Sequence, residues 1–219
     1  MINQYDETKA MDYENGFYLT SDISRMGNII AHYELYKRII NLPGDVIELG
    51  VFRGGTLVQF AAFRELLENE KSRRIIGFDV FGEFPMADNK ADEEFREKWI
   101  KETGNSFLTI DEVYSSLKHK KVENVELVKG DIVETLPKYI EQHPHLKVSL
   151  LHVDTDIYTP SKVGLELLYD KVVKNGVIIF DDYGVAGETE AVDEFLKDKD
   201  YVINKFSFSH RKPSYIIKK

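Results

Sequence analysis

Three aspartates are the residues of this chain whose type and spacing most suggest chemistry. Asp154 follows the apolar run 148–153, and Asp181 and Asp182 follow the next such run. Because the carboxyl ends of parallel strands meet at one edge of a sheet, we expect the three carboxylates to converge there. Acids so close repel one another unless a cation neutralises them, and oxygen ligands favour Mg²⁺ or Ca²⁺ over zinc. His152 stands in the same neighbourhood and is the exception to an all-oxygen set. Each aspartate alone could be a helix cap or a solvated loop residue, but the cluster favours a metal site.

A glycine-rich turn after an apolar strand is the second feature with chemical meaning. It lies within residues 44–56, where Glu48 stands one residue before the end of the expected strand and Gly50, Gly54 and Gly55 follow. A buried carboxylate is costly unless it is hydrogen-bonded, so Glu48 suggests a polar or cationic ligand at the strand end. Glycines permit a tight turn and a close approach of ligand to backbone. The turn therefore predicts a nucleotide-type site.

The order of the glycines narrows the kind of nucleotide. The turn lacks the G-x-G-x-x-G pattern of dinucleotide-binding folds, and no Gly-Lys-Ser/Thr of a phosphate-binding loop follows it. An acid-x-Gly turn instead resembles the first motif of class I S-adenosylmethionine (SAM) methyltransferases, in which the turn wraps the methionine part of the cofactor. The alternative is that the turn only closes a strand–helix unit, as glycine-rich turns commonly do.

Acids at the ends of the next two expected strands extend the same site. Asp79 ends the segment 73–79 beside the glycine turn, where it can accept both hydroxyls of a ribose, although a strand-terminal aspartate is often only a helix cap. Asp131 ends the segment 125–131, and in a SAM-type site an acid here faces the adenine amino group. The residues that we expect to bind the cofactor are Glu48, Gly50, Val51, Arg53, Thr56, Asp79, Val80, Gly130, Asp131 and Asp154.

Hydrophobic periodicity predicts an α/β fold that brings these residues together. Apolar spacings of three or four predict amphipathic helices, and short apolar runs predict strands buried in a parallel sheet. The expected helices span 24–42, 56–69, 135–142, 160–174 (capped by Thr159) and 188–198. The expected strands span 46–49, 73–79, 125–131, 148–154 and 177–180, before a hairpin of 201–208 and 214–217. We therefore predict an open, Rossmann-like sheet of the class I SAM-methyltransferase type, mostly parallel, with an antiparallel C-terminal hairpin strand and helices on both faces.

The length favours one domain over two. A chain of 219 residues that is 42% hydrophobic suits a single domain, residues 1–219, with a sizeable core. Residues 1–43 are expected to form an N-terminal arm, extended over 1–20, and a helix. Residues 80–121 are longer than a usual connection and contain the only tryptophan, Trp99. They form either a lid-like insertion over a substrate or a helix pair that merely covers the sheet, and the pattern supports both equally.

Composition and charge exclude other classes of protein. A chain without cysteine has neither disulfides nor thiolate metal sites, which is compatible with a reducing cytoplasm. No segment approaches the roughly 18 apolar residues of a membrane span, and the N-terminus is too polar for a signal peptide, so we expect a cytoplasmic protein. A net charge of −9 disfavours a nucleic-acid partner, and the basic residues His210, Arg211 and Lys212 are expected to be solvated. The aromatic residues of the helix over 24–42 favour core or oligomer contacts, which leaves room for a homo-oligomer.

Four ordered motifs make the chain resemble a known family. They are Glu48-Leu-Gly-Val-Phe-Arg-Gly-Gly, Asp79-Val-Phe-Gly-Glu-Phe-Pro, His152-Val-Asp-Thr-Asp-Ile-Tyr, and Asp181-Asp-Tyr-Gly with Ala191-Val-Asp-Glu-Phe. Over roughly residues 44–196 these motifs are similar to those of the macrocin O-methyltransferase family.

This resemblance implies a SAM- and Mg²⁺-dependent transfer of a methyl group to a hydroxyl of a sugar or glycosylated small molecule, such as an antibiotic deoxysugar or a surface glycan. It also implies that Asp154, Asp181 and Asp182 hold the metal. Catechol-type relatives carry a lysine three places after the first metal aspartate, where this chain has Ile157. The expected catalytic base is therefore Asp154 or Asp156.

Two other classes of protein remain open from the sequence. An NAD-dependent oxidoreductase would use the same sheet and the same Asp79, but it leaves the acid cluster unexplained. A non-catalytic nucleotide-binding protein would keep the cofactor turn without needing the acids. The expected cofactors are thus SAM and Mg²⁺, and the expected partner is a small-molecule or glycan substrate.

Overall fold

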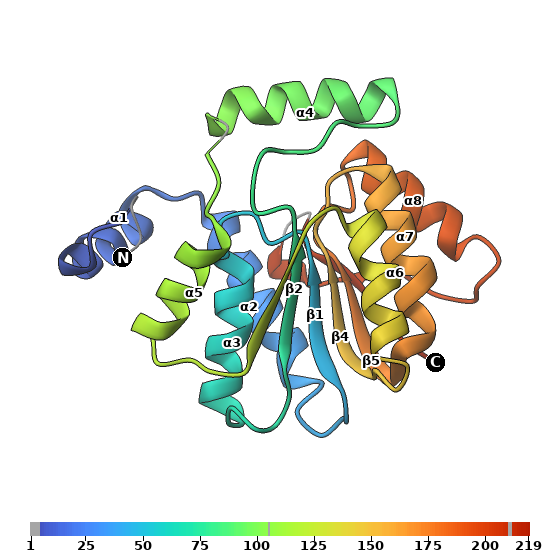
Figure 1. Ribbon diagram of the computed structural model, residues 1–219, viewed down its shortest axis with the longest axis horizontal. Coiled ribbons are helices and arrows are strands. Elements are labelled where there is room, and N and C mark those ends of the chain that lie inside the picture. Colours follow the sequence, from blue (N-terminus) through green and yellow to red (C-terminus); the bar gives the residue numbers. More distant parts are fainter. Residues whose placement is uncertain (1–4, 105, 210–211) are drawn as a thin grey trace.

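A computed structural model describes residues 5–104, 106–209 and 212–219. The strands in these residues are β1 (Asp45–Leu49), β2 (Ile75–Asp79), β3 (Val125–Lys129), β4 (Val148–Val153), β5 (Val172–Phe180), β6 (Asn204–Lys205) and β7 (Ser214–Ile217). They form one sheet in the order β3-β2-β1-β4-β5-β7-β6 (Figure 1). The first five are parallel, and β7 runs antiparallel to β5 and β6. The predicted sheet, mostly parallel with an antiparallel C-terminal strand, is confirmed.

Helices cover both faces of this sheet. They are α1 (Ala10–Thr20), α2 (Ile23–Lys37), α3 (Gly55–Leu67), α4 (Lys90–Thr103), α5 (Ile110–His119), α6 (Ile132–Gln142), α7 (Tyr158–Leu168) and α8 (Ala186–Leu196), with 3₁₀ turns η1 (Glu7–Lys9), η2 (Tyr169–Lys171) and η3 (Ser207–Ser209). Figure 1 shows α2, α3 and α5 on one face and α6, α7 and α8 on the other. None of the helices in the described residues is long and apolar enough to span a membrane.

Alternating side chains of the central strands divide the core into two layers. On β1, Val46 packs into the layer under α2, α3 and α5, whereas Ile47 and Leu49 pack into the layer under α6, α7 and α8. All three are fully buried, and each contributes roughly 1.5–3 kcal/mol by removal from water. Because both faces are covered, the strand is apolar on both sides, and this is the pattern from which it was predicted.

The N-terminal segment differs from the prediction. Residues 10–20 form helix α1 rather than an extended arm, while residues 1–4 of the expected arm lie outside the described residues. None of the side chains of α1 is buried, and Met11 and Leu19 are among the most exposed apolar residues. A helix without a buried side chain needs no apolar stripe, so its sequence shows no helical period.

Three boundaries in the second half of the chain were also predicted wrongly. Helix α7 ends at Leu168, and Asn175 and Gly176, expected to end it, lie inside β5, where the register against β4 shifts. A left-handed residue, here Asn175 with φ of 65°, suits a bulge as well as a helix end. The expected cap Thr159 lies within α7, whose N-cap is Ile157, and the strand expected over 201–208 is reduced to the two residues of β6.

The long connection over 80–121 contains α4 and α5. Figure 1 shows α4 above the carboxyl ends of the strands, apart from the two helical layers. Asp92 is its one buried residue, and its Oδ2 accepts a hydrogen bond of 2.9 Å from the backbone N–H of Tyr158, the first residue of α7. The N-cap of α7, Ile157, supplies no side-chain cap, so Asp92 takes that role from another helix. One carboxylate thus attaches α4 to the body of the fold.

We predict that Asp92→Ala releases the N-terminal half of α4. The substitution removes the acceptor for the N–H of Tyr158, which as a lost cap costs about 1 kcal/mol. Faster amide hydrogen exchange in α4, with unchanged exchange in the sheet, is the expected result. Glu97→Ala, which removes an exposed carboxylate from the same helix, is the matched control and should leave the exchange of α4 unaltered. Equal exchange rates in both variants would contradict the attachment.

Candidate active site

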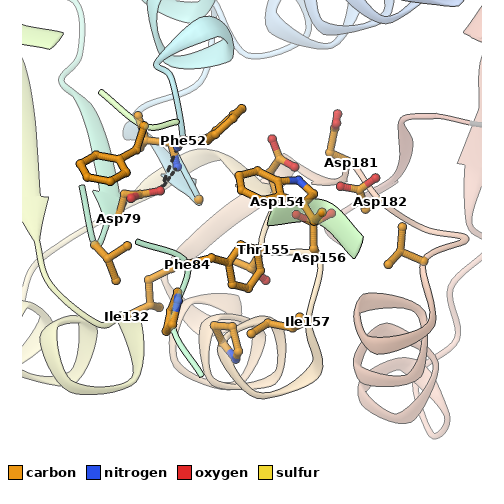
Figure 2. A pocket seen from close by; sticks show the side chains of 18 of the residues that line it. Phe52, Asp79, Phe84, Ile132, Asp154, Thr155, Asp156, Ile157, Asp181 and Asp182 are labelled. Carbon is orange, nitrogen blue, oxygen red and sulfur yellow. Dashed lines mark hydrogen bonds between the residues drawn. The ribbon is translucent and has the colours of Figure 1, made fainter. Parts of the chain in front are cut away.

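A cavity of about 860 Å³ opens where the carboxyl ends of the strands face α4 and the N-terminal half of α2. Figure 2 shows Asp79 on one side of it and Asp154, Asp156, Asp181 and Asp182 together on the other. Eleven of the predicted site residues line the cavity: Gly50, Val51, Arg53, Thr56, Asp79, Val80, Asp131, Asp154, Asp156, Asp181 and Asp182. Glu48 and Gly130 are not among its lining residues.

Asp79 holds the glycine turn in place. Its Oδ2 accepts hydrogen bonds from the backbone N–H groups of Val51 (2.8 Å) and Phe52 (2.9 Å), and its Oδ1 accepts one from Phe81 (2.6 Å). Burial raises the pKa of Asp79, although the three backbone donors oppose this shift. A carboxylate oxygen accepts about two hydrogen bonds, so Oδ1 keeps capacity for one more donor from the cavity.

Gly50 lets the turn approach the end of β4. Its φ is 88°, and a Cβ placed there would lie only 1.8 Å from the carbonyl oxygen of Asp154. The turn and the strand end that carries Asp154 are therefore in backbone contact, which sets how far the glycine turn lies from the acid cluster.

Aromatic rings of the 80–121 connection close the cavity from above. The ring of Trp99 on α4 lies 4.6 Å from that of Phe52 in the glycine turn and 5.2 Å from that of Phe84. Arg53 donates hydrogen bonds to the carbonyls of Thr103 and Ser106 at the C-terminal end of α4. Helix α4 is thus held at both ends, by Arg53 here and by Asp92 at α7.

The acid cluster consists of Asp154, Asp181 and Asp182. One carboxylate oxygen from each lies within 4.8 Å of the others, as predicted for strand ends that meet. Burial and then the charge of Asp181 raise the pKa of Asp154 well above its usual range. The ammonium of Lys212 makes an ion pair with Asp182, which was not predicted, although 41% of the Lys212 side chain stays exposed; His210 and Arg211 lie outside the described residues. An all-oxygen cluster that attracts a cation fits a hard divalent ion.

A buried ionic line runs from the middle of the sheet to this cluster. Glu48 and His152 are neighbours in register on β1 and β4, and Glu48 Oε1 lies 3.1 Å from His152 Nδ1. His152 Nε2 lies 3.3 Å from Asp181 Oδ1, an ion-pair distance without the alignment of a hydrogen bond. Burial lowers the pKa of His152, but the two flanking carboxylates outweigh burial and raise it well above its usual value. The carboxylate of Glu48 therefore contacts the imidazole ring of His152 and does not line the cavity. Burial raises the pKa of Glu48 to about 7.

Glu188 on α8 is a site residue that sequence reasoning missed. It is fully buried, its Oε1 accepts a hydrogen bond of 2.9 Å from the backbone N–H of Asp182, and its own N–H donates to the carbonyl of Asp156 at 3.3 Å. It therefore ties together the two loops that carry the acids. Burial and the charges of Asp154 and Asp156 raise its pKa well above its usual value. The sequence around Glu188 contains no motif that would have predicted this role.

One face of α2 also reaches the site, which was not predicted. Arg25 and Asn28 line the cavity, and His32 Nε2 lies 2.9 Å from Asp181 Oδ1. Only the spacing of these polar residues, three and four apart on one helix face, could have indicated it. The prediction for this helix considered its apolar face alone.

Residues 17–205 match the macrocin-O-methyltransferase (TylF) family. Two relatives come from Streptomyces. The 8-demethyl-8-(2,3-dimethoxy-alpha-L-rhamnosyl)-tetracenomycin-C 4'-O-methyltransferase of Streptomyces olivaceus is 25% identical over 157 residues, and the demethyldecarbamoylnovobiocin O-methyltransferase of Streptomyces niveus is 29% identical over 160. These matches cover 70% and 71% of this chain, but the chain spans only 58% and 59% of the relatives, less than two thirds of their length.

A solved structure is similar over nearly the whole fold. The crystal structure of CalS11, a calicheamicin methyltransferase, superposes with a TM-score of 0.73 at 25% identity and covers 98% of this chain and 87% of its own. The class I methyltransferase fold predicted from the apolar strands and the glycine turn is thereby confirmed.

We predict that Gly50→Ala destabilises the protein by roughly 2 kcal/mol or more, because the added Cβ overlaps the carbonyl of Asp154 and the left-handed conformation disfavours any side chain. Gly55→Ala is the matched control, since a Cβ at Gly55 meets nothing within 4 Å. It should leave the free energy of unfolding unchanged or raise it. Denaturant titration of both variants tests this. An equal change in the free energy of unfolding in the two variants would contradict the close contact between Gly50 and Asp154.

Proposed function

The chain belongs to the macrocin-O-methyltransferase (TylF) family, and we propose that it transfers the methyl group of SAM to a hydroxyl of a sugar on a natural product or glycan. One observation carries this proposal. A single cavity has the glycine turn and Asp79 on one side and the acid cluster on the other, so a cofactor and an acceptor hydroxyl can meet between them (Figure 2). The NAD-dependent oxidoreductase and the non-catalytic nucleotide-binding protein gain no support from the acid cluster.

The cofactor half of the proposed site is the side of the cavity formed by β1, β2 and β3. The turn from Gly50 to Thr56, with Val51 and Arg53, would surround the methionine part of SAM. The remaining acceptor capacity of Asp79 Oδ1, beside Val80, suits a ribose hydroxyl. Asp131 lines the cavity but also caps α6 by accepting from the N–H of Val133, so its second oxygen would meet the adenine amino group.

Two of the proposed cofactor residues act from a distance in this proposal. Glu48 is 1% exposed and bonded to His152, so it would stabilise the site through that imidazolium and not touch SAM. The N–H of Gly130 donates to the carbonyl of Asp79, so Gly130 would hold the backbone of the ribose-binding residue.

The acid half would hold a divalent cation. Asp154, Asp181 and Asp182 each offer an oxygen donor within 4.8 Å of the others, which suits a hard divalent cation, and the ion pair of Lys212 with Asp182 supports an attraction of the cluster for positive charge. A bound divalent cation lowers the pKa of an acceptor hydroxyl and helps to orient it.

The protein itself would mainly position the two reactants and take up a proton. The SAM sulfonium is a good leaving group, so alignment of the hydroxyl with the methyl group and exclusion of water can supply much of the rate. Trp99 and Phe84, which close the cavity, would exclude that water, and α4 would then act as a lid. The hydroxyl proton would pass to Asp156 or Asp154, both of which line the cavity; burial raises the pKa of Asp156 to about 6.

The acceptor class rests on the names of relatives. The Streptomyces olivaceus relative is named for methylation of a rhamnosyl group, and CalS11 for calicheamicin. We extend to this chain only the shared chemistry, a sugar hydroxyl. A single domain, a possible homo-oligomer and a cytoplasmic location stay predictions.

We predict that Asp181→Asn yields a folded protein that binds SAM but does not transfer the methyl group. The substitution removes one charged ligand from the cluster, so added Mg²⁺ should no longer raise the thermal midpoint, as linkage requires for a lost site. Asp170→Asn, at a largely exposed carboxylate, should keep both the Mg²⁺ response and the activity. Full methyl transfer by the wild-type protein in excess EDTA would refute the role of a divalent ion.

We predict that Asp79→Asn weakens SAM binding at least tenfold and lowers the free energy of unfolding by roughly 1–3 kcal/mol, because one amide oxygen cannot accept from three backbone N–H groups and a ribose. Asp79→Ala should be worse in both respects. Asp88→Asn makes the same charge change at another residue lining the cavity and should affect neither. Calorimetric titration with SAM checks this, and wild-type affinity in Asp79→Asn would remove Asp79 from the cofactor site.

A further inference from the structure

Helix α2 presents three polar side chains to the candidate active site from one face. Arg25, Asn28 and His32 are spaced by three and four residues, which places them in a row along the helix. Arg25 and Asn28 line the cavity, and His32 lies behind them with none of its surface exposed. A histidine buried without a partner is costly, so the position of its ring nitrogens decides what it does there.

The Nε2 atom of His32 points at Asp181 of the acid cluster. It lies 2.9 Å from Asp181 Oδ1, a normal hydrogen-bond distance across 149 residues of sequence. His152 Nε2 reaches the same oxygen at 3.3 Å, and Asn28 Nδ2 lies 3.5 Å from it. In the described part of the chain every hydrogen bond and ion pair of the Asp181 carboxylate uses Oδ1, so Oδ2 is the oxygen left for a further partner.

The other side of the imidazole is held by α3. The ring of Phe60 packs 5.5 Å from the imidazole ring, and Nδ1 is buried without a hydrogen-bond partner among the described residues. Nε2 is therefore the ring nitrogen that makes the polar contact, and since an ionised carboxylate only accepts, Nε2 carries the proton in that contact. His32 is therefore fixed in a geometry that donates to Asp181.

We propose that His32 is a positioning residue of the methyltransferase site: it holds Asp181 Oδ1 so that Oδ2 is presented to a divalent cation between Asp154 and Asp182. This inference rests on the proposed function, because it needs the acid cluster to bind a cation. A carboxylate whose one oxygen is anchored loses less rotamer freedom when the other oxygen becomes a ligand, and partners that orient metal ligands in this way typically contribute 10–100-fold to metal affinity. Helix α2, outside the four sequence motifs, thus becomes part of the active site.

The test compares three variants of the full chain. His32→Gln places an amide nitrogen near the position of Nε2, whereas His32→Asn is one methylene shorter and cannot reach Asp181. His32→Leu removes the donor and keeps most of the volume. His145→Leu, at an exposed histidine, is the matched control. The measurements are the affinity for Mg²⁺ and for SAM by calorimetry, the rise of the thermal midpoint with Mg²⁺, and kcat and KM for methyl transfer.

We expect His32→Leu and His32→Asn to bind Mg²⁺ about 10–100-fold more weakly than the wild type and His32→Gln to recover most of that loss. SAM affinity should stay within about twofold in all variants, because α2 touches the acid half of the cavity, so kcat should fall while SAM affinity holds. If His32 had only a structural role, its substitution would lower the thermal midpoint, but His32→Gln and His32→Asn would not differ in their affinity for Mg²⁺.

Each other outcome overturns a different statement. Equal Mg²⁺ affinity in His32→Gln and His32→Asn refutes the positioning role even if His32→Leu fails to fold. Stoichiometric Zn²⁺ binding that His32→Gln abolishes would make the imidazole a ligand instead, together with His152 and Asp181. If the wild-type protein binds neither SAM nor Mg²⁺, the proposed function fails before the role of His32 is reached.

Discussion

The cost of gathering carboxylates at one buried sheet edge is the constraint on which the rest of this structure depends. Glu48, on the central strand, has 1% of its surface exposed, and Asp181 lies beyond it at the end of β5. Neither charge would be tolerated there alone. His152 lies between them, and as an imidazolium it neutralises one negative charge and orients both carboxylates. Glu48 on β1 and His152 on β4 can therefore both be buried within an otherwise apolar part of the sheet.

The same need for compensation explains the residues that surround the acids. Lys212, from the loop before β7, brings an ammonium to Asp182, and Glu188 receives the N–H that follows Asp181. Each connects an element outside the first five strands to the carboxyl edge. The antiparallel strand and α8 are therefore more than cover for the sheet, since both fix the loop in which Asp181 and Asp182 stand.

Helix α4 shows how a nearly unburied element can still be placed over a cavity. It contributes a single buried side chain, Asp92, and its C-terminal end is held by Arg53 of the glycine turn. Both attachments are hydrogen bonds to backbone groups and bury little apolar surface. Such contacts open at a lower free-energy cost than core packing does, which would suit the proposed role of α4 as a lid. The sequence could indicate the length of this insertion but not its attachments.

The sequence by itself determined the strands of a mostly parallel sheet, the glycine turn, and the convergence of Asp154, Asp181 and Asp182, because these follow from local periodicity and from the rule that parallel strands end at one edge. Tertiary structure alone decided the rest. His32 and Glu188 reach the acids from helices whose patterns describe only their apolar faces. Glu48 looks like a ligand-binding acid until the register of β1 against β4 places it beside His152. Pairing across more than a hundred residues leaves no local periodicity, so only the folded chain reveals which charges meet.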